Sequence, residues 1–306
     1  MSSPNAPAGP PAPSGQPPLG PLILVIGKGG VGKTTVAAGL AEAAVQKGGQ
    51  AVLIEFGDGE SGRRVLGPRS GVVHRIVDPR AAMEDAVANL LGSQLLARVF
   101  IGNFAVRPML RAAPAMRELA MLECVRIHAD ELPGARVVVD MPATGHGLSW
   151  MRLPAQMRDM FASGPIHDLA VRLIDRLVSP SRSSVVVVTL PERLVLTETI
   201  ELCRALEVEV GLPAARLVVN RFPRELPPSA WDAARALSAK GGPAGDAADE
   251  LLAVLEARRE AQADAMEILD DARSGALRTR PLVLRESMED PTGAEVAAWL
   301  TAEAMA

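Results

Sequence analysis

The sequence is poor in aromatic residues and in cysteine. Aromatic residues make up only 3% of the 306 residues, and tyrosine is absent. A core therefore has to be built mainly from Val, Leu, Ala and Met, for which the apolar fraction of 48% is ample. The two cysteines, Cys124 and Cys203, lie far apart and in no CxxC pair. This pattern excludes a disulfide framework and fits a reducing, cytoplasmic location.

Long apolar runs and an excess of positive charge are also missing. The longest apolar runs, 22–26 and 185–188, have the length of a strand, whereas a membrane helix needs about 20 residues. No Lys or Arg precedes Lys28, so the N-terminus does not resemble a secretory signal. The net charge of −4 opposes attraction of the whole surface to nucleic acid. We therefore expect no transmembrane segment and no nucleic-acid partner.

Residues 1–21 differ from the rest of the chain. They are mainly Pro, Ala, Gly and Ser, with eight prolines from Pro4 to Pro21. Such a segment buries too little apolar area to offset the entropy lost on ordering. We predict a disordered tail over 1–21, with a ligand for a proline-binding module as a second interpretation.

From residue 22 onward, apolar segments of strand length are separated by longer helical patterns. Strands are predicted at 22–26, 51–55, 137–140, 185–189, 216–220 and 282–284. Helices are predicted at 34–47, at about 80–132, 148–178, 192–210, 229–239 and 247–273, and from about residue 293. Strands joined by helical crossovers predict a doubly wound α/β fold with a mostly parallel sheet. We expect one domain over 22–306, with helical insertions at about 80–132 and 148–178.

A phosphate-binding loop follows the first predicted strand. The residues from Gly27 to Thr34 read G-K-G-G-V-G-K-T and match the motif G-x-x-x-x-G-K-[ST] in full. The glycines let successive backbone N–H groups point into one concavity, and the start of the next helix adds its positive end. The residues predicted to bind the nucleotide here are Gly27, Gly29, Gly30, Val31, Gly32, Lys33, Thr34 and Thr35.

Two side chains of this loop have specific predicted roles. The Lys33 ammonium is expected to reach the β- and γ-phosphates, and the Thr34 hydroxyl is expected to hold Mg²⁺. The predicted cofactors are therefore ATP and Mg²⁺, and the predicted reaction is ATP hydrolysis.

The loop contains a second lysine, Lys28. The stretch K-G-G-V-G-K-T-T resembles the deviant Walker-A loop shared by arsenite-pump ATPases, targeting ATPases, nitrogenase iron proteins and MinD/ParA positioning ATPases. This resemblance implies that Lys28 reaches across a dimer interface to the partner's nucleotide, as an arginine finger does in trans. The alternative is a solvated loop lysine.

Residues 137–146 read V-V-V-D-M-P-A-T-G-H, a β-branched run that ends in Asp140. Such a strand delivers its carboxylate to the edge where open α/β sheets bind ligands. The element resembles the D-T-A-P-T-G-H switch II of the arsenite-pump and tail-anchored-protein-targeting ATPases, the ArsA/Get type, and departs from it at Met141. MinD and ParA proteins lack the P-x-T-G-H continuation. The resemblance implies that Asp140 holds Mg²⁺, through water, and that the turn at 145–146 senses the γ-phosphate.

A weaker resemblance concerns switch I. Asp58 matches the aspartate of the family's S-T-D-P-A-H, which positions or deprotonates the attacking water. Gly59 and Ser61 stand where the family has proline and histidine, so Glu55 or Glu60 could share or replace this role. An ordinary turn aspartate is the alternative.

Asn220 and Arg221 follow the fifth predicted strand and resemble the family's V-N-R adenine-reading element. An Asn amide can donate to and accept from the adenine edge at once. A turn Asn after a strand is the alternative.

Together, these resemblances imply a dimeric ATPase switch, a homodimer or a paralogous heterodimer, that couples hydrolysis to a protein client. Met-rich helical stretches suit a client groove, although stripes such as Trp150, Leu153 and Met157 are more typical of a core. An anion or metalloid pump subunit is the first alternative, which the two separated thiols oppose. A MinD/ParA-like positioning ATPase is the second, which the acidic stretch 293–306 opposes. The zinc-binding CxxC of the targeting ATPases is absent.

Overall fold

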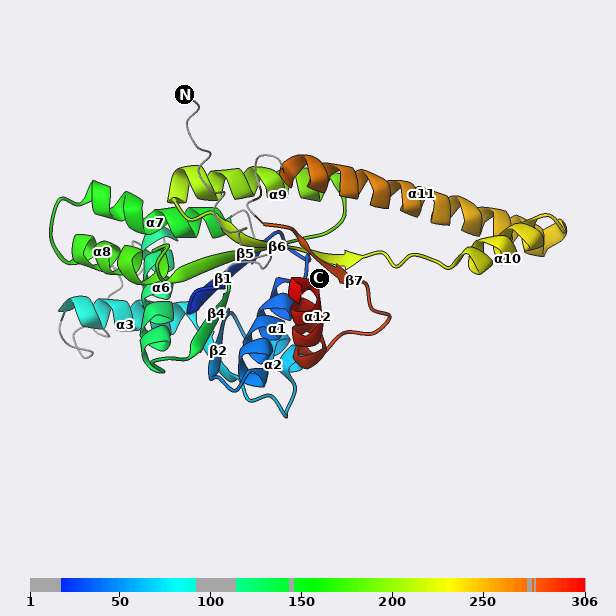
Figure 1. Ribbon diagram of the computed structural model, residues 1–306. Helices are drawn as coiled ribbons and strands as arrows, with labels where there is room; N and C mark the ends of the chain where they lie inside the picture. The colour runs from blue at the N-terminus through cyan, green and yellow to red at the C-terminus, as the bar shows by residue number, and fades with distance from the viewer. Residues whose placement is uncertain (1–17, 92–113, 143–145, 274–276, 278, 306) are drawn as a thin grey trace, which may run out of the picture.

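The computed structural model describes residues 18–91, 114–142, 146–273, 277 and 279–305 (Figure 1). The described strands form one seven-stranded sheet in the order β3-β2-β4-β1-β5-β6-β7, and every pair is parallel. Their bounds are Leu22–Gly27 (β1), Ala51–Phe56 (β2), Val73–Val77 (β3), Arg136–Asp140 (β4), Ser183–Thr189 (β5), Ala214–Phe222 (β6) and Leu282–Arg285 (β7). The predicted doubly wound α/β fold is confirmed.

Helices cover both faces of this sheet. One face carries α1 (Lys33–Gln46), α2 (Glu60–Leu66) and α12 (Gly293–Met305). The other face carries α3 (Pro79–Leu91), α6 (Pro114–Asp130), α7 (His146–Met160), α8 (Pro165–Leu177) and α9 (Arg193–Ala205), which a π-helical turn at Leu206–Val210 extends. Because both faces are covered, buried strands are apolar at consecutive positions instead of alternating.

Strand β1 illustrates this packing. Leu22, Leu24 and Ile26 belong to the core beneath α6 to α9, while Ile23 and Val25 belong to the core beneath α1 and α12. Truncation of such a buried side chain to Ala costs about 2–5 kcal/mol. The strand that leads into the phosphate loop is therefore fixed from both sides.

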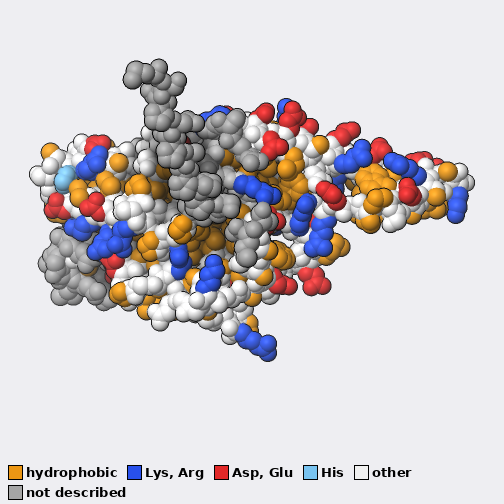
Figure 2. Space-filling model, in the orientation of Figure 1, with side chains coloured by type: hydrophobic (Ala, Val, Ile, Leu, Met, Phe, Trp, Pro, Cys, Tyr) orange, Lys and Arg blue, Asp and Glu red, His pale blue; other side chains and the backbone are white. Residues whose placement is uncertain are grey.

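Helices α10 (Pro228–Ser238) and α11 (Gly242–Arg273) form an arm that projects from the body (Figure 1). The Arg259 guanidinium lies 5.6 Å from the centre of the Trp231 ring and joins the two helices. In the space-filling view, the arm carries apolar side chains bordered by charged ones (Figure 2). Its exposed apolar residues include Leu237, Leu251 and Val254.

The structure differs from the sequence-based expectation in several elements. Strand β3 and helix α2 were not predicted, because β3 is a half-exposed edge strand with polar residues and α2 has only seven residues. The helix predicted at 148–178 is two helices, since Gly164, with φ of 98°, and Pro165 begin α8. The part of the predicted insertion at 92–113 lies outside the described residues.

The described chain also begins earlier than the predicted boundary at residue 22. The Gly20 N–H donates to Ser184 Oγ at 2.8 Å, and the Pro21 carbonyl accepts from the Val137 N–H at 2.9 Å. These bonds attach the end of the Pro-rich segment to β4 and β5. Residues 1–17 of the predicted tail lie outside the described residues.

Candidate nucleotide site

The phosphate loop joins β1 to α1, and two of its glycines are required by its geometry. Gly27 has φ of 151°, and a Cβ at this position would overlap the Val188 carbonyl oxygen. Gly32 has φ of 90° and leads into α1, and a Cβ there would overlap the Asn220 amide. Only glycine adopts such backbone angles without strain. The loop thus passes close to β5 and β6 and presents the first N–H groups of α1 to the same space.

Lys33 is a buried lysine at the first residue of α1. Its Nζ donates to the Lys28 carbonyl oxygen at 2.8 Å, which places the ammonium across the loop. Burial lowers the pKa of Lys33, and the nearby Asp140 carboxylate acts in the opposite direction. A buried cation held by one neutral carbonyl is well suited to an anionic phosphate.

Thr34 and Asp140 lie together beside this lysine. The Thr34 hydroxyl donates to Asp140 Oδ2 at 2.5 Å, whereas Asp140 Oδ1 is buried without a hydrogen-bond partner among the described residues. Burial raises the pKa of Asp140 to about 6, and Glu55 adds to this rise. The Thr34 hydrogen bond and Lys33 oppose it. A hydroxyl beside a carboxylate oxygen that lacks a partner fits Mg²⁺ or a water bound to it.

Glu55 neighbours Asp140 on the sheet, because β2 and β4 pair these two positions. Its buried Oε2 accepts a hydrogen bond from the Gly62 N–H at 3.0 Å and lies 3.0 Å from His74 Nε2. Glu55 therefore connects β2 to β3 and to the first turn of α2. Sequence reasoning did not single out His74, since no recognisable pattern marks β3.

Asp58 is exposed, in contrast to Glu55. Its Oδ1 accepts a hydrogen bond from the Glu60 N–H at 3.0 Å, a local turn at the start of α2. Asp58 and Glu55 flank the Phe56–Gly57 turn, and Glu55 is the one paired with Asp140 across the sheet.

Lys28 reaches outward from the loop and forms an ion pair with Glu198 of α9 in the same chain. Both side chains remain accessible, at 46% for Lys28 and 42% for Glu198. The pair is therefore screened by solvent and weak. It could not be predicted from the sequence because the two residues lie on separate elements.

Asn220 and Arg221 lie where β6 passes the loop. Asn220 Nδ2 donates to the Val31 carbonyl oxygen at 2.9 Å, which ties the phosphate loop to β6. Arg221 is exposed and has φ of 53°, at a register shift between β6 and β7. A bulge of this kind re-aims side chains at the rim of a sheet. In the structure Asn220 therefore contacts the phosphate loop. Its contact with adenine stays a prediction.

The rest of switch II is described only in part. Met141 is buried and Pro142 is half-buried, while Thr144 and Gly145 lie outside the described residues. Helix α7 begins at His146, directly after this segment. In the described part of the chain, no group of three or more His, Cys, Asp and Glu side chains is placed to hold a metal ion. No described helix is long and apolar enough to cross a membrane.

These residues lie at the carboxyl end of β1, with β4 on one side and β5 on the other. The phosphate loop lies at the end of β1, where the crossover connections to the neighbouring strands diverge. A buried lysine and a hydroxyl–carboxylate pair follow it. Together these features define a nucleotide-binding P-loop protein. The family model described as the CobQ/CobB/MinD/ParA nucleotide binding domain matches residues 22–256. The chain belongs to this family.

Two relatives are similar to this chain at low sequence identity. The chain is 29% identical to ATPase BagA of Mycobacterium tuberculosis over 230 residues, which cover 68% of this chain and 67% of the relative. It is 26% identical to uncharacterized protein SCO2128 of Streptomyces coelicolor over 172 residues, which cover 53% of this chain and 41% of that protein.

Proposed function

We propose that this protein binds Mg²⁺–ATP in the phosphate loop and hydrolyses it, as a dimeric switch of the ArsA/Get type. The arrangement of Lys33, Thr34 and Asp140 carries the proposal. It combines a buried cation with a hydroxyl–carboxylate pair at the start of a helix, which are the groups that phosphoryl transfer requires.

In this proposal Lys33 and the N–H groups of α1 bind the β- and γ-phosphates. Thr34 and Asp140 hold Mg²⁺, which supplies positive charge beside the γ-phosphate when it is bound. Lys33 lies close enough to Asp140 to affect its titration, so the lysine, the hydroxyl and the carboxylate share one site. Most of the catalytic effect then comes from electrostatic positioning.

The water that attacks the phosphate needs an acceptor to orient it. Asp58 is the proposed residue, because its carboxylate is exposed at the turn after β2 and, within the described part of the chain, accepts a local hydrogen bond from the Glu60 N–H. Glu55 is proposed to position the switch, since its carboxylate is already bonded to Gly62 and His74.

Dimerisation is proposed to involve Lys28. Its side chain is accessible, and the pair with Glu198 is a surface ion pair that costs little to open. ATP would give Lys28 of each chain a more highly charged partner than Glu198, the γ-phosphate in the second chain. Helix α7, which starts at His146, would carry the resulting change away from the site.

The Met-rich stretches give little support to a client groove. Met121, Met151 and Met157 are buried in the core, as are Trp150 and Leu153. Met160 is 69% exposed, and Met109 lies outside the described residues. A protein client therefore rests on the resemblance alone. A thiol-based metalloid site finds no support either, because burial raises the pKa of Cys124 to about 11 and of Cys203 to about 12.

Steady-state hydrolysis of Mg²⁺–ATP tests this proposal. Lys33→Ala should lower turnover by roughly 100-fold or more, because it removes the buried charge at the phosphates. Lys240→Ala removes the same charge from an exposed site between α10 and α11 and serves as the control. Equal turnover in Lys33→Ala and in the wild type would refute the site.

A further inference from the structure

Helix α2 follows the turn that carries Asp58, and its two ends are attached in different ways. Val65 and Leu66 end the helix and pack, partly buried, against the apolar core beneath α1 and α12. The start of the helix has no side chain of this kind, because residues 60–62 read Glu-Ser-Gly. A helix of seven residues has little stability of its own. The position of its first turn, and of Asp58 beside it, therefore depends on polar contacts.

Glu55 makes the polar contact that joins this first turn to the sheet. The Gly62 N–H is one of the helix-start donors that have no partner inside a helix, and it donates to Glu55 Oε2 at 3.0 Å. Asp58 accepts from the Glu60 N–H, but it belongs to the same turn and does not attach it to the sheet. A Cβ at Gly62 would overlap Glu55 Oε2, so the backbone of α2 fits closely against this carboxylate.

His74 of β3 holds Glu55 in this position. Leu53 lies opposite His74 in the parallel register of β2 and β3, and Glu55 is two residues further along β2, so both polar side chains project from the same face of the sheet. His74 Nε2 lies 3.0 Å from Glu55 Oε2, and the two side chains are only 16% and 8% exposed. An ionised carboxylate only accepts hydrogen bonds, so Nε2 is the donor.

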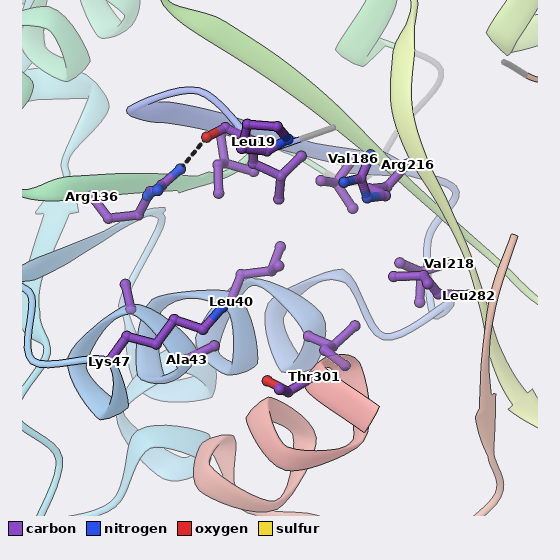
Figure 3. A pocket seen from close by; sticks show the side chains of 14 residues that line it. Leu19, Leu40, Ala43, Lys47, Arg136, Val186, Arg216, Val218, Leu282 and Thr301 are labelled. Atoms are coloured by element: carbon purple, nitrogen blue, oxygen red, sulfur yellow. Dashed lines mark hydrogen bonds between the residues drawn. The ribbon is translucent and has the colours of Figure 1, made fainter. Parts of the chain in front are cut away.

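Glu55 needs this support because of its other neighbour. Burial raises the pKa of Asp140, and the charge of Glu55, which β2 places beside it, adds to this rise. Two neighbouring carboxylates repel each other. The strands are fixed at their other end, where Arg136 at the start of β4 donates to the Leu19 carbonyl oxygen at 2.6 Å (Figure 3). The freedom at the site therefore lies in the Glu55 side chain and in the turn that it holds.

We propose that His74 is a positioning residue of the site. By donating to Glu55 it keeps that carboxylate on the Gly62 N–H, and through this bond it fixes the turn that carries Asp58. The inference rests on the proposed function, in which Asp58 orients the attacking water. His74 acts on turnover and not on nucleotide binding, because the phosphate loop and Lys33 are held by contacts of their own.

Substitutions of similar size separate the hydrogen bond of His74 from its packing. His74→Gln keeps an N–H donor on a side chain of similar reach, whereas His74→Leu and His74→Met keep the bulk and lack a donor. Two donor-free variants are used so that one that fails to fold does not end the test. Arg75→Gln is the control, because Arg75 follows His74 on β3, projects from the opposite face and pairs with Glu131 at 3.2 Å.

Hydrogen exchange followed by mass spectrometry, without nucleotide, is the first measurement. The amides of residues 57–62 should exchange about tenfold faster in the donor-free variants, because the acceptor of the Gly62 N–H is no longer held in place. Steady-state ATP hydrolysis is the second measurement. In the same variants kcat should fall about tenfold, while KM for ATP stays within about twofold of the wild type. His74→Gln and Arg75→Gln should resemble the wild type in both measurements.

The proposal is overturned if a folded donor-free variant matches the wild type in exchange or in kcat. It is also overturned if His74→Gln is as impaired as the donor-free variants, or if KM rises while kcat is unchanged. A wild-type protein that does not hydrolyse ATP would refute the proposed function itself, and the exchange measurement would still show whether His74 holds this turn.

Discussion

Replacing Asp140 with Asn should stabilise the protein in the absence of Mg²⁺ and nucleotide, while it removes ATP turnover. The reason is that the Asp140 carboxylate is buried and one of its oxygens has no partner among the described residues, so its ionised form is costly without a cation. Asn keeps the size of the side chain and can still accept the hydrogen bond from Thr34.

The expected size follows from the raised pKa of Asp140. The folded protein holds the proton up to about pH 6, compared with an ordinary value of 3.8. At about 1.4 kcal/mol per pKa unit, the ionised carboxylate lowers the unfolding free energy by about 3 kcal/mol above pH 6. Below pH 3.8 this loss is absent, and it grows between those two values as the pH rises. The unpaired Asn amide hydrogens offset about 1–3 kcal/mol of the gain.

The assay is urea unfolding in EDTA, with wild type and Asp140→Asn compared at pH 5 and pH 8. The stability of the variant relative to the wild type should increase by about 1.5 kcal/mol between these values, because about half of the penalty is already present at pH 5. Asp58→Asn removes an exposed carboxylate nearby and serves as the control for charge alone. A difference between wild type and Asp140→Asn that is the same at both pH values would refute the reasoning.

Three further results are expected. Asp58→Asn should bind ATP and hydrolyse it slowly, whereas Glu55→Gln should have a smaller effect on turnover; a more damaging Glu55→Gln would mean that the proposed switch I assignment is wrong. Glu198→Gln should strengthen ATP-dependent dimerisation in light scattering, because it releases Lys28, while an unchanged dimer constant would show that the pair plays no part. Elemental analysis should find no structural zinc and arsenite should not raise ATPase activity, since Cys124 is half-buried, Cys203 is buried and burial raises the pKa of both thiols; one zinc per dimer or stimulation by arsenite would contradict this.

The sheet and the phosphate loop could be predicted because both have local signatures. Strands β1, β2, β4 and β5 are apolar at consecutive positions, and the glycines of the loop follow β1 directly. Strand β3 could not be predicted in this way. Its residues V-H-R-I-V face a half-exposed edge, so they carry neither a buried run nor a strict alternation.

The site contacts that could not be predicted join elements that are distant in the sequence. The bond between Glu55 and His74 depends on the pairing of β2 with β3, and the pair of Lys28 with Glu198 depends on where α9 lies. Asn220 binds the Val31 carbonyl because β6 passes the loop. Residue types and spacing predicted which side chains are candidates for the site, but the fold decides which of them touch.

A mixing experiment tests the trans role of Lys28 most directly. Lys28→Ala keeps its own phosphate loop and Asp140, while Asp140→Asn keeps Lys28 but lacks the proposed Mg²⁺ carboxylate. In a mixed dimer, the Asp140→Asn chain can supply its Lys28 to the nucleotide site of the Lys28→Ala chain, which is then complete. Each variant alone should be nearly inactive, and an equimolar mixture should recover about a quarter of the wild-type turnover per chain, because half of the dimers are mixed and each holds one complete site. No recovery above the sum of the two variants, or normal turnover by Lys28→Ala alone, would contradict the proposed dimeric mechanism.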